Sequence, residues 1–367
     1  MTHSAPYRAD QVGSLLRPES LHQARRDFKE GKISKETLRE AENHAIQRIV
    51  EKQIEIGLPA VTDGEFRRSW WHYDFLEHLN GMEGYVSTEG RPFKGIQTER
   101  YNVRNIGKVA FNPDHPFIEE FKIFHSYVNG RAAAKLTIPS PNQLFVKEIR
   151  NRELYPDIED YAKDVIQTYK DAIQAFYEAG VRYLQLDDVY IASLASDEEP
   201  YSDESISTER LIELAVKVIN GSLEDKPEDL YVTTHLCRGN YRSKWAFQGS
   251  YARIAPQLFA KAKFDGFFLE YDDERSGDFK ALDHIPQGGA KVVLGLVTSK
   301  TGELEDKEAI IARIKEAAEH VPLDQLALST QCGFSSTHHG NELTEEDQWN
   351  KLKLVMEIAK DVWGTVY

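Results

Sequence analysis

Two residues of the segment TTHLCRGN, His235 and Cys237, carry side chains that can bind transition metals. They are two positions apart, and in a β-strand the side chains of residues i and i+2 point to the same face. Imidazole nitrogen and thiolate sulfur are both ligands of Zn²⁺. The pair alone is weak evidence, because a histidine and a cysteine can also end an ordinary buried strand.

Two further residues extend this pair to a possible four-ligand site. The only other cysteine, Cys332 in STQCGFSS, ends a second strand-like run, and Glu270 ends the apolar run DGFFLE. Glu270 could instead be a solvated acid or the partner of nearby Arg275. Taken together, the histidine, the carboxylate and the two thiols match the ligand number and types of a tetrahedral zinc site. We therefore predict zinc as the cofactor.

The types of ligand indicate what this zinc would do. A zinc that activates water has few anionic ligands, because it must stay electrophilic. Two thiolates and a carboxylate would instead give the whole site a net negative charge. Such a site can still deprotonate a thiol, whose free pKa is about 8.5, and leave its sulfur able to attack carbon. The ligand set therefore predicts alkylation of a thiol rather than hydrolysis.

Short apolar runs alternate along the chain with longer amphipathic stretches, a pattern typical of a parallel sheet covered by helices. We predict eight strands, at residues 11–16, 59–66, 132–141, 182–189, 230–237, 266–271, 291–299 and 325–332. Predicted helices include 34–57, 158–180 and 344–363, the last with a capping-box pattern at its start. This order favours one α/β unit over residues 1–367, a single (β/α)8 TIM barrel, with an open doubly wound sheet as the alternative.

The stretch from about Leu79 to Val128 does not follow this alternation. It is rich in glycine, asparagine, proline and aromatic residues, and it shows the pattern of neither a helix nor a barrel strand. We predict that it forms an insertion after the second strand. The preceding segment SWWHYDF (69–75) is either an aromatic loop at the rim or a packed turn of the core.

Polar side chains stand at the end of nearly every predicted strand. In a parallel barrel the carboxyl ends of all strands meet at one rim, where the following loops build the active site. The residues concerned are Gly13 and Ser14, Asp63 to Glu65, Asp187 and Asp188, His235 and Cys237, Glu270, Thr298 to Lys300, and Cys332. We therefore expect a site for chemistry at this rim.

Composition limits the possible partners. The chain has 367 residues, of which 41% are hydrophobic and 29% charged, as in ordinary globular proteins. Its net charge of −15 disfavours nucleic acid and anionic membranes as partners. Two cysteines, and no apolar run near the ~20 residues that span a bilayer, indicate a cytoplasmic protein. We expect small-molecule substrates.

In these motifs the chain resembles the C-terminal catalytic barrel of the cobalamin-independent methionine synthase family. The resemblance runs in order through VGS (12–14), TDGEF (62–66), LQLDD (184–188), HLC (235–237), LEYDDERSGDF (269–279) and QCGF (331–334). It implies that the four predicted ligands hold zinc, that zinc binds the sulfur of homocysteine, and that a methyl group of 5-methyltetrahydrofolate moves to this sulfur to give methionine. It further implies that Ser14 with loop amides binds the carboxylate of homocysteine, and that Glu65 and Asp187 bind its ammonium group.

The chain departs from the family pattern in the half of the site that would bind the methyl donor. Long members carry a second, N-terminal barrel, which is absent here, so the resemblance is to a short stand-alone form. The family histidine that protonates the leaving folate nitrogen has no counterpart in GLVTSKTG, where Lys300 takes its position. The family's pterin-stacking tryptophan corresponds to Phe145. One of the two histidines of STHHGNE (336–342) could supply the missing proton, or this segment is a solvated loop. The donor is thus 5-methyltetrahydrofolate or a related compound.

Three other functions remain open. The first is a metal-free barrel enzyme resembling uroporphyrinogen decarboxylase, which would act on an anionic tetrapyrrole. The second is a zinc methyltransferase for another small thiol. The third is a non-catalytic protein that binds zinc or an amino acid.

Overall fold

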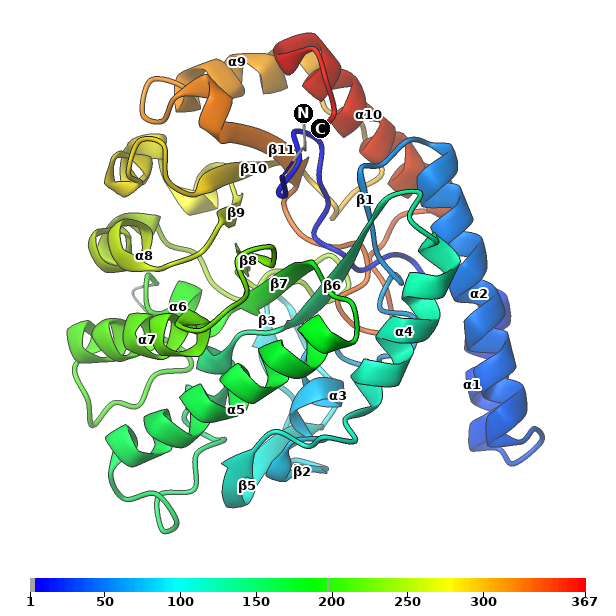
Figure 1. Ribbon diagram of the computed structural model, residues 1–367, viewed down its shortest axis with the longest axis vertical. Coiled ribbons are helices and arrows are strands. Elements are labelled where there is room, and N and C mark those ends of the chain that lie inside the picture. The colour runs from blue at the N-terminus through cyan, green and yellow to red at the C-terminus, as the bar shows by residue number, and fades with distance from the viewer. Residues whose placement is uncertain (1–3, 197) are drawn as a thin grey trace.

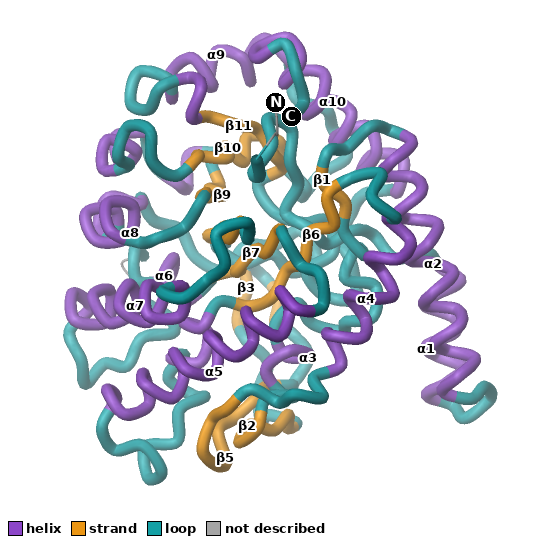
Figure 2. Tube along the Cα trace, in the orientation of Figure 1, coloured by secondary structure: helices purple, strands orange, loops and turns teal. Residues whose placement is uncertain are grey.

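The computed structural model describes residues 4–196 and 198–367. Its main sheet is curled and parallel, with helices on its outer side (Figure 1 and Figure 2). The order in the sheet is β1 (Ala60–Val61), β6 (Ala133–Pro139), β7 (Tyr183–Asp188), β8 (Tyr231–Leu236), β9 (Gly266–Glu270), β10 (Lys291–Val297) and β11 (Leu326–Thr330). The α/β fold with a TIM-like arrangement is therefore confirmed.

The strands bring polar residues to one side of the sheet. All residues of β7, β9 and β11 are buried, as expected for parallel strands covered on both faces. Asp187 of β7 pairs in register with His235 of β8, and Leu236 pairs with Leu269 of β9. Because neighbouring strands run in the same direction, Asp188 and Glu270 end at the same rim.

Two helices precede β1, and further helices alternate with the strands of the main sheet. The helices are α1 (Glu19–Lys29), α2 (Lys35–Glu55), α3 (Tyr73–Leu76), α4 (Pro116–Val128), α5 (Ile158–Glu178), α6 (Tyr190–Ser193), α7 (Thr208–Leu223), α8 (Ala255–Lys261), α9 (Lys307–Ala317) and α10 (Glu345–Trp363). The side chain of Thr344 caps α10, and Asp347 completes the capping box. Among the described residues, no helix combines the length and the apolar character that crossing a membrane requires.

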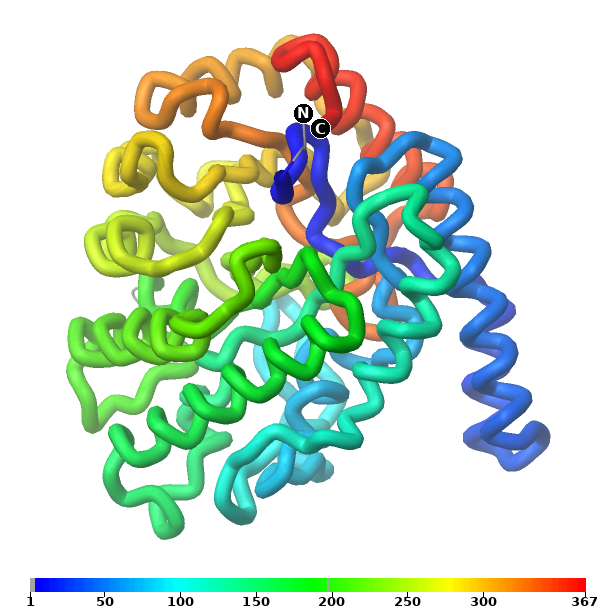
Figure 3. The backbone as a smooth tube through the Cα atoms, viewed as in Figure 1, coloured from blue at the N-terminus to red at the C-terminus, as the bar shows by residue number. Residues whose placement is uncertain are grey.

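The predicted first strand, residues 11–16, is not a strand in the structure. The N-terminal segment instead makes one isolated bridge, from Ala9 to Leu328 of β11. Just after it, Gln11 Nε2 donates to the carbonyl of Ala60 in β1 (3.1 Å). This segment, dark blue in Figure 3, therefore contacts both edge strands of the sheet. The expectation failed because the apolar run makes isolated hydrogen bonds and no strand ladder, for example from Thr62 Oγ1 to the carbonyl of Gly13, where φ is +146°.

A buried ion pair fixes the N-terminal segment inside the sheet. Lys135 of β6 lies 3.2 Å from Asp10, and both side chains are fully buried. The hydroxyl of Tyr183 donates to the same carboxylate at 2.8 Å. Two charges in such a place are stable only when they are paired and hydrogen-bonded.

The stretch from Leu79 to Val128 contains a helix that the sequence analysis missed. Its first part forms two small antiparallel sheets, from β2 (Asn80–Tyr85) with β5 (Asn102–Ala110) and from β3 (Pro92–Phe93) with β4 (Ile96–Gln97). Its last part is α4, which begins with a proline in its first turn and ends at Asn129 in the left-handed conformation. The prediction that this stretch holds no helix was wrong, because Phe117, Phe121 and Phe124 are core residues at helical spacing.

Candidate metal centre and substrate cavity

The four predicted metal ligands meet at the rim. His235 ends β8, Cys237 follows it, Glu270 ends β9, and Cys332 follows β11. One donor atom from each lies within 4.8 Å of the others, and all four residues are buried. The two sulfur atoms are 3.6 Å apart. The period of the strand explains the first pair, because His235 and Cys237 lie on the same face of β8.

The surroundings of these side chains fit a zinc ion. Neither ring nitrogen of His235 has a hydrogen-bond partner among the described residues, although the ring is buried. The contact between the sulfurs raises the pKa of Cys237 and lowers that of Cys332, so the isolated pair retains a proton. A cation between the sulfurs would stabilise two thiolates and give the orphaned imidazole a partner.

Residues of two loops contact the carboxylate of Glu270, one in the loop after β8 and one in the loop after β9. Its Oε1 accepts from the backbone amide of Arg238 at 3.1 Å, and its Oε2 lies 3.7 Å from the guanidinium of Arg275. Arg275, the alternative partner that the sequence offers for Glu270, thus lies beside the carboxylate. Burial raises the pKa of Glu270, so a nearby positive charge is needed to keep it ionised.

Glu65, Asp187 and Ser14 line the same cavity as the metal group. Glu65 has a φ of 61°, which is rare for a residue with a side chain and which aims the carboxylate inward. Its Oε1 accepts from Thr137 (2.8 Å), while its buried Oε2 has no partner among the described residues. The carboxylate of Asp187 accepts from Gln185 at 2.7 Å, and burial raises its pKa to about 7.

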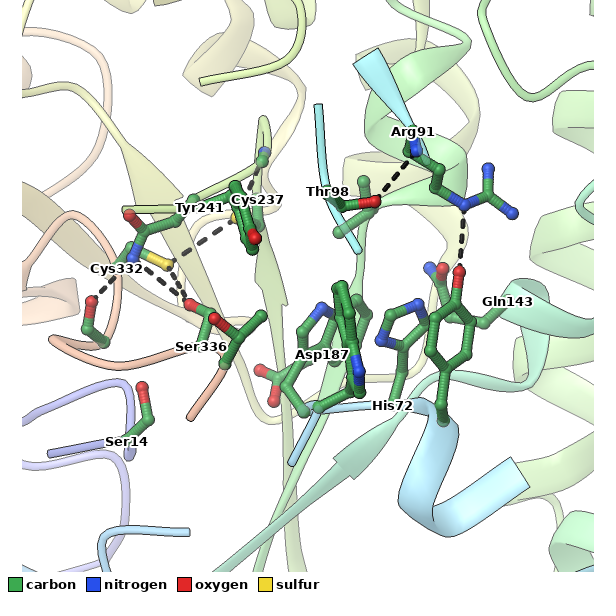
Figure 4. A pocket seen from close by; sticks show the side chains of 18 of the residues that line it. Ser14, His72, Arg91, Thr98, Gln143, Asp187, Cys237, Tyr241, Cys332 and Ser336 are labelled. Atoms are coloured by element: carbon green, nitrogen blue, oxygen red, sulfur yellow. Dashed lines mark hydrogen bonds between the residues drawn. The ribbon is translucent and has the colours of Figure 1, made fainter. Parts of the chain in front are cut away.

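Ser14 is packed against the loop that carries Cys332. Its Oγ accepts from the backbone amide of Ser335 at 3.2 Å. A Cβ atom added at Gly333 would lie only 2.0 Å from this Oγ, so the loop can approach Ser14 only because residue 333 is glycine. Figure 4 shows Ser14, Ser336 and Cys332 on the same side of the cavity.

Two predicted site residues do not face the cavity. Phe145 lies in a short 3₁₀ turn and packs edge-on against Tyr161 at 5.3 Å between ring centroids, away from the cavity lining. Lys300 forms ion pairs with Asp272 and Asp273 and is not among the lining residues. Both positions were assigned by alignment to a family pattern, and local packing turns these side chains elsewhere.

Aromatic side chains line two sides of the cavity: Tyr241 lies beside Cys237, whereas His72, stacked on Trp71, lies across the cavity from the cysteines and forms its aromatic end (Figure 4). Trp70, Trp71, His72 and Tyr241 line it, and the rings of Trp70 and Tyr241 are nearly parallel. The first part of the segment SWWHYDF is thus at the rim, while Phe75 packs in the core. Arg91, which also lines the cavity, was not singled out because it lies in the irregular stretch before α4. In Figure 4, His72 and Arg91 lie across the cavity from the two cysteines.

Arg17 is a further residue that sequence reasoning missed. Its buried guanidinium donates to Ser335 Oγ and to the backbone carbonyl of Glu65, both at 2.6 Å. It thereby ties the loop after β1 to the loop after β11. No motif of the sequence marks it, because both partners are distant along the chain.

Comparison with known proteins defines the class. The family model described as "Cobalamin-independent synthase, Catalytic domain" matches residues 8–91 and 150–361. The chain belongs to this family, as its motifs predicted. This membership favours the synthase interpretation over a uroporphyrinogen-decarboxylase-like barrel.

Individual relatives share nearly the full length of the chain. The uncharacterized protein YxjH of Bacillus subtilis is 49% identical over 361 residues, which are 98% of this chain and 95% of YxjH. A methionine synthase of Sulfolobus acidocaldarius is 24% identical over 326 residues, 88% of this chain and 84% of that protein. The crystal structure of a candidate vitamin-B12-independent methionine synthase from Listeria monocytogenes is 42% identical, covers 99% of this chain and 100% of its own, and superposes with a TM-score of 0.81.

Proposed function

We propose that this protein is a zinc-dependent methyltransferase that moves a methyl group from a donor to the sulfur of homocysteine and so forms methionine. The observation that carries the proposal is the convergence of four buried donor groups within 4.8 Å beside a cavity. Membership of the synthase family supports the type of reaction. Carboxylates and a hydroxyl in the same cavity suit an amino-acid substrate.

His235, Cys237, Glu270 and Cys332 would hold the zinc. When bound there, zinc would lower the pKa of a thiol and leave its sulfur nucleophilic. The chain itself holds the two cysteine sulfurs together, keeps Glu270 in place through the Arg238 amide, and excludes water by burying all four groups.

Glu65 and Asp187 would bind the ammonium group of homocysteine. Each carboxylate has one oxygen held by a neighbouring side chain, Thr137 for Glu65 and Gln185 for Asp187. An ammonium group between them would favour their ionised forms, which burial otherwise disfavours. Ser14 and the loop amides near it would bind the carboxylate of the same substrate, as an anion needs hydrogen-bond donors.

The methyl donor would lie at the aromatic end of the cavity. Trp71 and His72 stack there with ring centroids 4.2 Å apart, and Trp70 and Tyr241 stack nearby. Flat rings of this kind suit a heterocyclic donor such as 5-methyltetrahydrofolate or a relative. Because Phe145 and Lys300 point elsewhere, these aromatic residues replace Phe145 as the proposed stacking surface.

We also propose that residues 1–367 form one (β/α)8 barrel. The N-terminal segment near Ala9 would take the place of the eighth strand, since it contacts both edge strands of the sheet. The two small sheets between Asn80 and Ala110 would be the insertion after β1, with α4 as a regular barrel helix.

A crossed substrate assay tests the function. Purified protein is incubated with homocysteine, cysteine or a coenzyme-M-like thiol, each with several methyl donors, and its zinc content is measured in parallel. We expect methionine from homocysteine, about one zinc per chain in the buried group, and loss of both in Cys332→Ser. If a different thiol were methylated in place of homocysteine, that thiol would be the substrate. If no donor gave methyl transfer to any thiol, the proposed methyltransferase function would be contradicted.

A further inference from the structure

A second group of metal-binding side chains lies near the mouth of the cavity, apart from the buried group. Glu99 lies between β4 and β5, and the adjacent His338 and His339 follow β11. Nε2 of His339 is 3.3 Å from Glu99 Oε1, and Nε2 of His338 is 3.9 Å from the same oxygen. One donor atom from each of the three lies within 4.8 Å of the others.

The Nδ1 atom of each imidazole ring lies within hydrogen-bond distance of another group of the protein. Nδ1 of His338 lies 3.4 Å from the backbone carbonyl of Ser69, and Nδ1 of His339 lies 3.1 Å from Thr337 Oγ1. A carbonyl oxygen only accepts, so Nδ1 of His338 carries the proton and its Nε2 keeps a lone pair. Hydrogen bonds of this kind orient the histidines that bind metals.

We propose that Glu99, His338 and His339 form a second metal site, for a borderline divalent ion such as Zn²⁺. In a tetrahedral zinc site with bonds of about 2.0 Å, neighbouring ligand atoms are ~3.3 Å apart. The separations of 3.3 and 3.9 Å from Glu99 to the two imidazoles need only small adjustments to reach that value. Two nitrogens and one carboxylate oxygen suit zinc rather than calcium or magnesium, and the fourth position is left for water.

This ion would join two segments across the mouth of the cavity. Thr98 precedes Glu99 and Thr337 precedes His338, and both threonines line the cavity. The chain before Thr98 is the hairpin of β3 and β4, whose Phe93 packs against Tyr241. Ligation would therefore fix this hairpin to the loop after β11 and restrict its opening. The site has no sulfur ligand, and its carboxylate is 55% exposed, so it binds more weakly than the buried group.

The test is a titration of the zinc-loaded full-length protein with Co²⁺. We expect a second ion whose spectrum shows d–d bands without sulfur-to-metal charge transfer. Its affinity should fall at least tenfold in His339→Ala and in Glu99→Gln, and should not change in His44→Ala, which removes an exposed histidine elsewhere. Cys332→Ser should retain this ion, so the outcome is independent of the proposed methyltransferase function.

Hydrogen exchange gives a second measurement on the same samples. Backbone amides of residues 90–101 should exchange more slowly after the second ion binds, in the wild type and not in Glu99→Gln. No second ion, or one that binds equally well to both Glu99→Gln and His339→Ala, would overturn the proposal.

Discussion

The sulfur atoms of Cys237 and Cys332 lie 3.6 Å apart, although 95 positions separate these residues along the chain. The strands that they follow, β8 and β11, are not neighbours, because β9 and β10 lie between them. The contact therefore depends on the curvature of the whole sheet, which directs the ends of distant strands toward one point. The four side chains of the metal group therefore come together through the fold of the whole sheet, and no single loop carries them all.

The role of Asp187 can be tested with the substrate's amine. A charge-assisted hydrogen bond from ammonium to carboxylate contributes about 1.5–3 kcal/mol, or roughly a 10- to 100-fold change in binding. Asp187→Asn should therefore raise the KM for homocysteine by that factor while the zinc content stays unchanged. The comparison thiol is 4-mercaptobutyrate, which lacks the amine. If the wild-type protein used it as well as homocysteine, Asp187 and Glu65 would not recognise the ammonium group.

The aromatic end of the cavity should affect the methyl donor and not the thiol. Stacking against one aromatic ring contributes about 0.5–1.5 kcal/mol beyond the burial of area. Trp71→Ala should thus raise the KM for a heterocyclic donor roughly 2- to 10-fold or more, with Trp71→Phe less affected. Steady-state kinetics with the donor varied at saturating homocysteine measures this. An effect on the KM of homocysteine alone would place the thiol, and not the donor, at this end.

The buried ion pair between Lys135 and Asp10 should stabilise the attachment of the N-terminal segment. Removing one partner of a buried pair costs about 3–5 kcal/mol, because the other charge is left without compensation. We expect Lys135→Met to lower the free energy of unfolding by this amount, measured by urea denaturation. Lys135→Met combined with Asp10→Asn should recover part of the loss. Equal destabilisation in the single and double variants would show that packing, and not charge, dominates.

His115 makes the stability of the protein sensitive to acid. Its Nδ1 accepts from the amide of Phe117 (3.3 Å) and its Nε2 lies 3.0 Å from the carbonyl of Phe75, so the neutral ring caps α4. Burial lowers its pKa from 6.5 to about 4. Its contribution is therefore fully present above pH 6.5 and is lost as the pH falls toward about 4.

The expected loss from this histidine is about 2 kcal/mol between pH 7 and pH 5. It is measured as the difference in unfolding free energy between the wild type and His115→Asn, since asparagine can also cap a helix. His44→Gln, at an exposed position, is the matched control. If the wild type and His115→Asn lost the same stability over this range, other groups would be responsible.

Much of the fold could be predicted from the sequence because the strands are short buried runs. Residues 230–237 and 266–271 contain the observed β8 and β9, each within about two residues. The side-chain period of a strand and the common direction of parallel strands then sufficed to bring His235 and Cys237 toward Glu270. These are local rules, and they hold where the sheet is regular.

The errors fall where distant contacts decide the conformation. The apolar run at 11–16 has the composition of a strand, but the chain pairs with β11 before it, at Ala9. The role of Lys300 toward the donor stays a prediction, and the structure pairs its ammonium group with Asp272, which is 28 positions away. The composition of residues 79–128, rich in glycine, asparagine and proline, does not predict α4, although the phenylalanines of its core face stand at helical spacing.

The central claim is that the thiol substrate binds to a zinc held by His235, Cys237, Glu270 and Cys332. Zinc-edge X-ray absorption of the purified protein tests it most directly, recorded with and without homocysteine. The account predicts two sulfur ligands in the free protein and three after homocysteine is added, with Cys332→Ser unable to retain the metal. A sulfur count that does not rise with homocysteine, or zinc retained fully in Cys332→Ser, would contradict it.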